Sequence, residues 1–201
     1  MGINLQKGQK ISLTKDNAGL GKVMVGLGWD AVKEKKGLLG GLFGGGAADI
    51  DCDASVFMLD DQDKMNHKKN IVYYGHLLSD CGSIKHMGDN LTGEGEGDDE
   101  QVMVNLSQVP ENVKKLVFVV NIYNAKKRNQ HFGMIENAFI RIVDMSTNQE
   151  IMKYNLSEEY GGKTALIAGE MYRHNGEWKF GALGEATTDD SLSTLARKYG
   201  L

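Results

Sequence analysis

The stretch "TALIAGEMYRHNGEWKFGALG" at residues 164–184 contains the clearest fold signal in the chain. Two runs rich in apolar and aromatic residues flank the pair Asn175-Gly176. An Asn-Gly pair favours a tight β-hairpin turn, because both central residues of that turn need positive φ angles. The stretch therefore predicts two adjacent antiparallel strands.

Similar short runs, separated by turn signals, recur along the rest of the chain. They are rich in Val, Ile, Phe and Tyr, which favour strands. The predicted strands are 9–13, 22–29 (broken by its glycines), 54–60, 70–75, 100–106, 115–123, 138–145 and 150–156. This pattern predicts a mainly β protein, an antiparallel β-sandwich with long acidic loops. A chain of 201 residues suits one substantial core, so we expect a single domain over 1–201.

One helix is predicted at the end of the chain, in "TTDDSLSTLARKYGL" (187–201). Thr188 or Asp190 is the expected N-cap, and basic residues occupy the last turn. The shared apolar face and the glycine after the helix are expected at Leu192, Leu195, Tyr199 and Gly200. A shorter helix fits residues 125–131.

Composition and termini predict a cytoplasmic protein. Hydrophobic residues make up 41% of the chain and charged residues 25%. The start of the chain does not resemble a signal peptide, and no apolar run approaches the ~18 residues of a membrane helix. Cys52 and Cys81 form no CxxC motif, so we expect two reduced and mostly buried thiols.

The net charge of −4 conceals a strong segregation of charge. Residues 37–63 and 86–113 together hold 13 of the 27 acids and none of the 23 Lys and Arg residues. Phosphate groups require Lys or Arg, so these zones argue against nucleic-acid binding. The basic run 124–130 and the glycine-rich run 36–49 are predicted to be loops. An acidic partner for the first and a partner contact for the second remain alternatives.

The first acidic zone contains "ADIDCDAS" (48–55). Asp49, Asp51 and Asp53 alternate along this stretch, so an extended strand places all three on one face. Ile50 and Cys52 then face the core. Alternate aspartates at the start of a strand suit a hard cation such as Ca²⁺, which takes 6–8 oxygen ligands in irregular geometry.

The second zone contains "GDNLTGEGEGDDE" (88–100), which offers the same chemistry. Its glycines allow backbone carbonyls to turn inward. The flanks are predicted strands, which excludes an EF-hand. The five histidines form no HxH or HExxH pair, which argues against zinc; His86 is expected to be a loop hydrogen-bonder. Solvated loop charges remain the alternative to a metal site.

Several motifs together resemble the TerD family of bacterial tellurite-resistance and general stress proteins. They are "VGLGWD" (25–30), "DIDCDAS" (49–55), "GDNLTGEGEGDDE" (88–100), "FVVNIYNA" (118–125) and "GEMYRHNGEWKF" (169–180). The resemblance extends over nearly the whole chain. It implies a β-sandwich that binds Ca²⁺, with more than one ion, and no catalytic activity. It also implies partners among other stress and tellurite-resistance proteins, some membrane-associated, with no small-molecule substrate and a location extending to the inner face of the membrane.

Carried over position by position, the resemblance implies one set of metal-site residues. The set is Asp30, Asp49, Asp51, Asp53, Asp89, Asn90, Thr92, Gly93, Glu94, Gly95, Asp98, Asp99 and Glu100. Three departures bear on this set. A glycine-rich insert occupies 37–46, the family's "IHDA" reads "IYNA" at 122–125, and its "YNN" reads "YGH" at 74–76.

Three functions remain open at this point. The first is a non-catalytic calcium-binding module whose ordered loops bind partners. The second is a divalent-metal-dependent hydrolase of the phosphoesterase kind, since clustered acids can hold two metal ions. The third is a metal-free acidic scaffold that binds a basic protein.

Overall fold

The computed structural model describes residues 2–31, 50–88, 97–156 and 160–201. Twelve strands dominate these residues. The strands are β1 (Ile3–Leu5), β2 (Lys10–Ser12), β3 (Lys22–Ala31), β4 (Cys52–Leu59), β5 (Ile71–Val72), β6 (Ile84–His86), β7 (Glu100–Asn105), β8 (Lys115–Ile122), β9 (Ile135–Asp144), β10 (Gln149–Asn155), β11 (Ala165–His174) and β12 (Glu177–Thr187). The helices are α1 (Ala125–Arg128) and α2 (Leu192–Ala196), with short 3-10 segments at Lys68–Asn70, Phe132–Met134 and Arg197–Tyr199.

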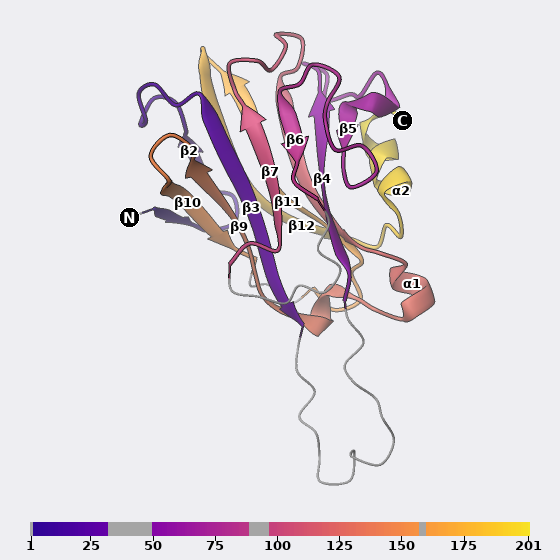
Figure 1. The fold of residues 1–201 in the computed structure, drawn as a ribbon. Helices are drawn as coiled ribbons and strands as arrows, with labels where there is room; N and C mark the ends of the chain where they lie inside the picture. The colour runs from indigo at the N-terminus through magenta and orange to yellow at the C-terminus, as the bar shows by residue number, and fades with distance from the viewer. Residues whose placement is uncertain (1, 32–49, 89–96, 157–159) are drawn as a thin grey trace.

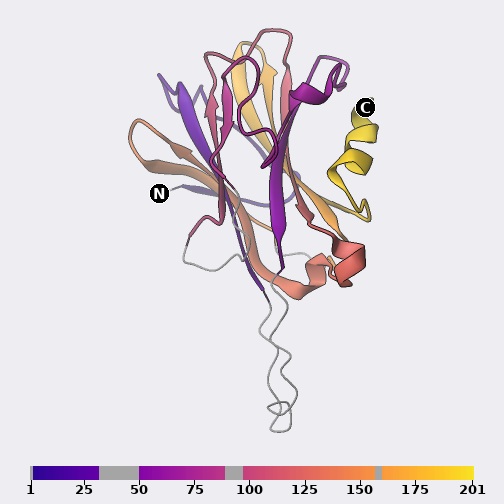
Figure 2. The same ribbon diagram turned by 45° about the vertical axis from the view of Figure 1, so that its right-hand side comes forward.

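The strands form two six-stranded sheets that pack face to face (Figures 1 and 2). The first sheet has the order β1-β10-β9-β3-β7-β6, and the second has the order β2-β12-β11-β8-β4-β5. Within the described part of the chain, every strand pair is antiparallel except β1 with β10, which is parallel. The predicted antiparallel β-sandwich is therefore confirmed, with one parallel pair at an edge of the first sheet.

Alternation along the strands builds the core between the sheets. In β3, Val23, Val25, Leu27 and Trp29 are buried and face the second sheet. The intervening positions face outward, as the strand period of two requires. The prediction that this strand breaks at its glycines is wrong: β3 continues to Ala31, and only its register with β9 shifts between Gly28 and Asp30. Gly26 and Gly28 lie where neighbouring side chains occupy the space of a Cβ.

A second apolar cluster lies on the outer face of the second sheet. Leu195 and Ala196 of α2 pack there against Phe57, Val117 and Ile167. Figure 2 shows α2 standing beside this sheet, near the C-terminus. Burial on both faces explains why β4 is buried along its whole length.

The predicted hairpin is confirmed: β11 and β12 are antiparallel neighbours, and Asn175 and Gly176 have φ angles of 53° and 78°. One other strand prediction needed correction, and two strands were missed. The predicted strand 70–75 shortens to β5, since it pairs with β4 only at Ile71 and Val72. Strands β1 and β6, three residues each, were not predicted.

The C-terminal helix is confirmed, with a different start. Ser191 is the N-cap, since its side chain accepts the Thr194 N–H, and neither Thr188 nor Asp190 takes that role. The helix region ends at Gly200, whose φ of 94° suits the predicted glycine. Among the described residues, no helix is long and apolar enough to cross a membrane.

The prediction of two mostly buried thiols holds for Cys52 and is wrong for Cys81, which is exposed. Cys81 lies in the turn that the Gly82 N–H closes on the Ser79 carbonyl, so its side chain sits at a surface corner.

Candidate functional site

Three strands bring acidic residues to one end of the sandwich. They are the end of β3, the start of β4 and the start of β7. The end of β3 and the start of β4 lie toward the bottom of Figure 1. We call the following residues the acidic end: Asp30, Asp51, Asp53, Asp98, Asp99 and Glu100.

Four of these carboxylates raise the pKa of a buried thiol. Burial raises the pKa of Cys52 well above its ordinary value, and the charges of Asp53, Glu100, Asp51 and Asp99 raise it further. The two acidic zones, distant in sequence, meet directly where the Ala54 N–H donates to Glu100.

The pKa of Asp99 is also raised. Its pKa is raised by partial burial and then by the charges of Asp30 and Asp98, although the backbone N–H of Trp29 donates to its Oδ2 at 2.7 Å. Burial and nearby like charges both disfavour the ionised form of a carboxylate, and a bound cation would favour it.

Asp98 forms an ion pair with Arg141. Its two carboxylate oxygens accept hydrogen bonds from Arg141 Nε at 2.6 Å and Nη2 at 2.9 Å, and its side chain is fully buried. A Cβ at Gly26 would overlap this carboxylate, and a Cβ at Gly28 would strike the Phe139 ring. The alternation in "VGLGWD" therefore serves both faces of β3, with large residues inside and glycines beneath Asp98 and Phe139.

Glu100 and His86 tie the two sheets together at their open edge. Glu100 Oε2 accepts the Ala54 N–H of β4 at 2.5 Å, and His86 Nε2 lies 3.3 Å from the same oxygen. His86 Nε2 also lies 3.2 Å from the Ala54 carbonyl oxygen. The N–H of Gly88 donates to His86 Nδ1, which assigns the ring proton to Nε2 in the neutral tautomer. His86 is therefore a hydrogen-bonder, as expected, but it is buried between the sheets.

Asp51 and Asp53 lie on the outer face of the second sheet, while Ile50 and Cys52 face the core as predicted. Asp51 Oδ2 is 3.6 Å from Arg128 Nη1, and Asp53 Oδ2 accepts a hydrogen bond from Asn121 Nδ2 at 3.3 Å. The predicted basic loop thus contributes one of its cations to the acidic end.

The rest of the predicted metal set lies outside the described residues. These are Asp49, Asp89, Asn90, Thr92, Gly93, Glu94 and Gly95. In the described ranges, no group of three or more His, Cys, Asp or Glu side chains is arranged to hold a metal ion. Asp30, Asp51, Asp53 and Asp99 have the oxygen chemistry that a hard cation prefers.

Sequence reasoning missed two partners of the acidic end. Arg141 neutralises Asp98, and Asn137 Nδ2 donates to Asp30 Oδ2 at 2.8 Å. A weak signal existed for Arg141, the only basic residue in its strand. Nothing along the chain indicated that this arginine would lie beside Asp98, because the two are 43 residues apart.

The fold and the site define a β-sandwich protein with an acid-rich end assembled from three strands. A TerD domain matches residues 1–199, and the chain belongs to the TerD family. Stress response protein SCP2 of Bacillus subtilis (strain 168) is 56% identical over 99% of this chain and 100% of its own length. General stress protein 16U of the same strain is 50% identical over 100% of this chain and 98% of its own.

Tellurium resistance protein TerD of Serratia marcescens is 41% identical over 100% of this chain and 98% of its own. Among solved structures, a homologue of telluride resistance protein (TerD) from Streptomyces coelicolor A3(2) superposes with a TM-score of 0.59 at 19% identity. It covers 86% of this chain and 92% of its own length, and at this identity it supports the fold alone.

Proposed function

We propose that this chain is a non-catalytic, calcium-binding stress-response protein. Ca²⁺ joins the strand ends of the acidic end to the acidic loops and so shapes a surface for partners. The observation that carries the proposal is the meeting of three strand ends. The Ala54 N–H of β4 donates to Glu100 of β7, and the Trp29 N–H of β3 donates to Asp99, whose pKa is raised by partial burial and by the charges of Asp30 and Asp98. Relatives named as stress and tellurium resistance proteins support the biological context.

Calcium suits this end of the sandwich better than a softer metal. Ca²⁺ takes 6–8 oxygen ligands at ~2.3–2.6 Å and tolerates irregular geometry. We assign Asp30, Asp51, Asp53 and Asp99 to its ligand set, together with the oxygens predicted between residues 89 and 95, and we expect more than one ion.

Asp98 and Glu100 take a different part in the proposal. Their oxygens are used by Arg141 and by the Ala54 N–H, so they hold the start of β7 against β3 and β4. Rigid placement of the start of β7 lowers the ordering cost when a cation binds Asp99.

The partners we propose are other stress and tellurite-resistance proteins, some of them associated with the inner face of the membrane. We propose that this protein binds them in the cytoplasm. Ca²⁺ reduces the repulsion among the carboxylates, which would otherwise oppose an ordered loop surface.

Calcium titration of chelator-treated protein tests this proposal. We expect calorimetry to report binding, and Ca²⁺ at 100 times its Kd to stabilise the fold by ~2.7 kcal/mol through mass action. Asp99→Asn should weaken binding about tenfold, a loss of about 1.4 kcal/mol. Asp16→Asn is the matched control, because Asp16 is an exposed aspartate before the opposite end of β3.

The absence of any thermal shift in millimolar Ca²⁺ would refute the proposal. Partner binding with steep salt dependence and no calcium dependence would then favour a metal-free acidic scaffold.

A further inference from the structure

A groove lies between the outer face of the second sheet and the segment that carries α2. Its volume is about 550 Å³, within the ~300–1,000 Å³ of small-molecule sites. Strands β4 and β8 form its floor, and residues 190–197 form one side. The groove borders the apolar cluster that α2 covers, and it shares Ile71, Leu192 and Ala196 with that cluster.

The floor of the groove is polar and buried. Asp53 and Asn121 are direct partners across β4 and β8, and Ser55 is the next residue of β4 on the same face. Their exposed fractions are 4%, 7% and 1%. Side chains of neighbouring strands on one face lie close enough to act on a single ligand group.

Two polar atoms of this floor lack a hydrogen-bond partner within the part of the chain that the structure describes. They are Ser55 Oγ and Asn121 Oδ1. Leaving a buried polar group unpaired costs about 1–3 kcal/mol, so folded proteins seldom do so without a reason. Since the Asn121 oxygen is an acceptor beside the Asp53 carboxylate, the missing group is a hydrogen-bond donor, and a cation suits it best.

Cationic and aromatic side chains also line the groove. Lys68 and Arg197 are exposed lining residues of the groove, and Tyr73, Tyr74 and Tyr123 line it as well. Asp190 also lines it and is paired with Lys126. Tyrosine rings favour planar or cationic groups on their faces. The groove therefore combines buried acceptors, aromatic rings and exposed cations.

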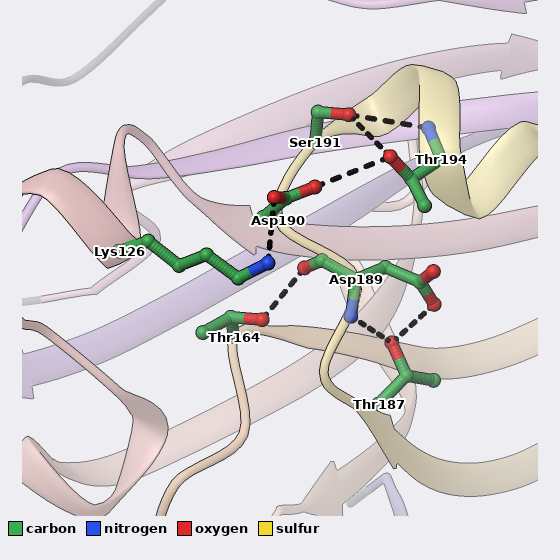
Figure 3. Close-up of polar contacts among 7 residues, drawn as sticks. All are labelled: Lys126, Thr164, Thr187, Asp189, Asp190, Ser191 and Thr194. Atoms are coloured by element: carbon green, nitrogen blue, oxygen red, sulfur yellow. Dashed lines mark hydrogen bonds and ion pairs between the residues drawn. The ribbon is translucent and has the colours of Figure 1, made fainter.

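A polar network holds the α2 side of the groove in place (Figure 3). Lys126 Nζ pairs with Asp190 at 2.7 Å, and Thr164 Oγ1 donates to the Asp189 carbonyl oxygen at 2.6 Å. Thr187 Oγ1 donates to the Asp189 carboxylate at 2.7 Å. These bonds join the segment before α2 to α1, β11 and β12, so the groove is formed before any ligand arrives.

We infer that this groove binds a small zwitterion, with a guanidinium or amino group on the Asp53–Ser55–Asn121 floor and an anionic group facing Lys68 and Arg197. A guanidinium fits best, because it is planar, stacks on aromatic rings and offers several donors at once. The inference goes beyond calcium binding, since Ser55 and Asn121 are not in the predicted metal set. Asp53 belongs to both proposals, so bound Ca²⁺ should weaken L-arginine binding.

L-arginine is the first probe, measured by calorimetry on the full chain with chelator and again with Ca²⁺. Two analogues each remove one charge: L-citrulline has a neutral ureido group in place of the guanidinium, and agmatine lacks the carboxylate. We expect L-arginine to bind and each analogue to bind at least tenfold more weakly, a difference of about 1.4 kcal/mol. No heat or thermal shift with about 10 mM L-arginine, far above the Kd of typical small-ligand sites, would overturn the inference. Equal binding of either analogue would overturn it too.

Variants separate the two ends of the groove. Asn121→Leu should weaken L-arginine binding at least tenfold, whereas Asn4→Leu, at an exposed asparagine on β1, should leave it unchanged. Ser55→Ala is a smaller second change and should weaken binding about threefold. Unchanged binding in Asn121→Leu and Ser55→Ala would refute the floor assignment.

Arg197→Gln should weaken L-arginine binding but not agmatine binding, and equal losses for both probes would contradict the assignment of Arg197. Its calcium titration should match that of the wild type. A failure of arginine binding is thereby distinguished from a failure of the calcium proposal.

Discussion

The two ends of β4 carry aspartates at similar density but place them in opposite environments. Asp51 and Asp53, at its start, are 7% and 4% exposed and belong to the acidic end. Asp60 and Asp61, after its end, are only partly buried or exposed in a turn. In the sequence, all four lie in one stretch without a Lys or Arg.

The turn satisfies its carboxylates locally. Asp60 Oδ1 accepts the backbone N–H groups of Gln62 and Lys64, each at 2.9 Å, and these bonds lower its pKa, with the Lys64 bond foremost. At the acidic end, burial and neighbouring charges raise the pKa of Asp99 instead. Acidic density alone therefore does not identify a cation site; the direction of the pKa shift separates the two ends of β4 better.

Replacing Glu100 should cause the largest loss of stability. Glu100→Leu leaves the Ala54 N–H and His86 without their buried partner, and we expect the free energy of unfolding to fall by about 3–4 kcal/mol. Asp61→Leu, at the turn, should change it by less than about 0.5 kcal/mol. Urea denaturation measures both, and similar losses would show that the two ends of β4 do not differ.

Gly26→Ala tests whether the backbone of β3 makes room for the acidic end. The added Cβ would displace the Asp98 carboxylate from Arg141, so we expect a loss of about 2–3 kcal/mol. Gly181→Ala is the matched control, since its nearest contact is 3.6 Å away, and its effect should stay within about 0.5 kcal/mol. If the two variants have equal stability, Asp98 does not depend on the glycine.

The two regions should respond to pH with opposite sign. The lowered pKa of Asp60 stabilises the fold at pH values above the ordinary carboxyl pKa of about 3.9. That stabilisation is lost as the pH falls through the lower pKa of the folded state. The raised pKa of Asp99 does the reverse in calcium-free protein: it lowers stability at neutral pH, and that cost is relieved as the pH falls through the raised value.

Denaturation of Asp60→Asn and Asp99→Asn between pH 3 and 7 (about the range of carboxyl titration) measures these signs. At neutral pH, Asp60→Asn should be less stable than the wild type and Asp99→Asn should be more stable. Both differences in the free energy of unfolding should shrink as the pH falls. The same sign in both variants would contradict the assignment of charge relief to Asp99.

Thiol labelling should give the smallest energetic effect but a clear contrast in rate. Burial, followed by four carboxylates, raises the pKa of Cys52. For Cys81, partial burial opposes ionisation, but hydrogen bonds from Ser79 and Ser83 lower its pKa overall. An aromatic disulfide reagent should label Cys81 in the native state and Cys52 only on unfolding, because the thiolate is the reacting form. Equal rates would show that Cys52 is not enclosed by the acidic end.

Local features of the fold could be predicted because they depend on local chemistry. The Asn175-Gly176 turn and the alternation in β7 follow from φ requirements and side-chain period. β1 and β6 were missed because three residues carry too little alternation to identify a strand. Ser191 is the N-cap in place of the predicted residues. Asp190 is adjacent and could also accept a helix N–H, but it forms an ion pair with Lys126.

By itself, the sequence determined that the protein is a β-sandwich, that the acids are segregated, and that Asp51 and Asp53 share a face. Only the tertiary structure decided which acids meet, which are neutralised and which lie over a groove. Asp98 with Arg141 and Asp53 with Asn121 join residues 43 and 68 positions apart. Such pairs depend on the order and register of the strands in each sheet, and burial of the whole core, rather than any local spacing, selects that order.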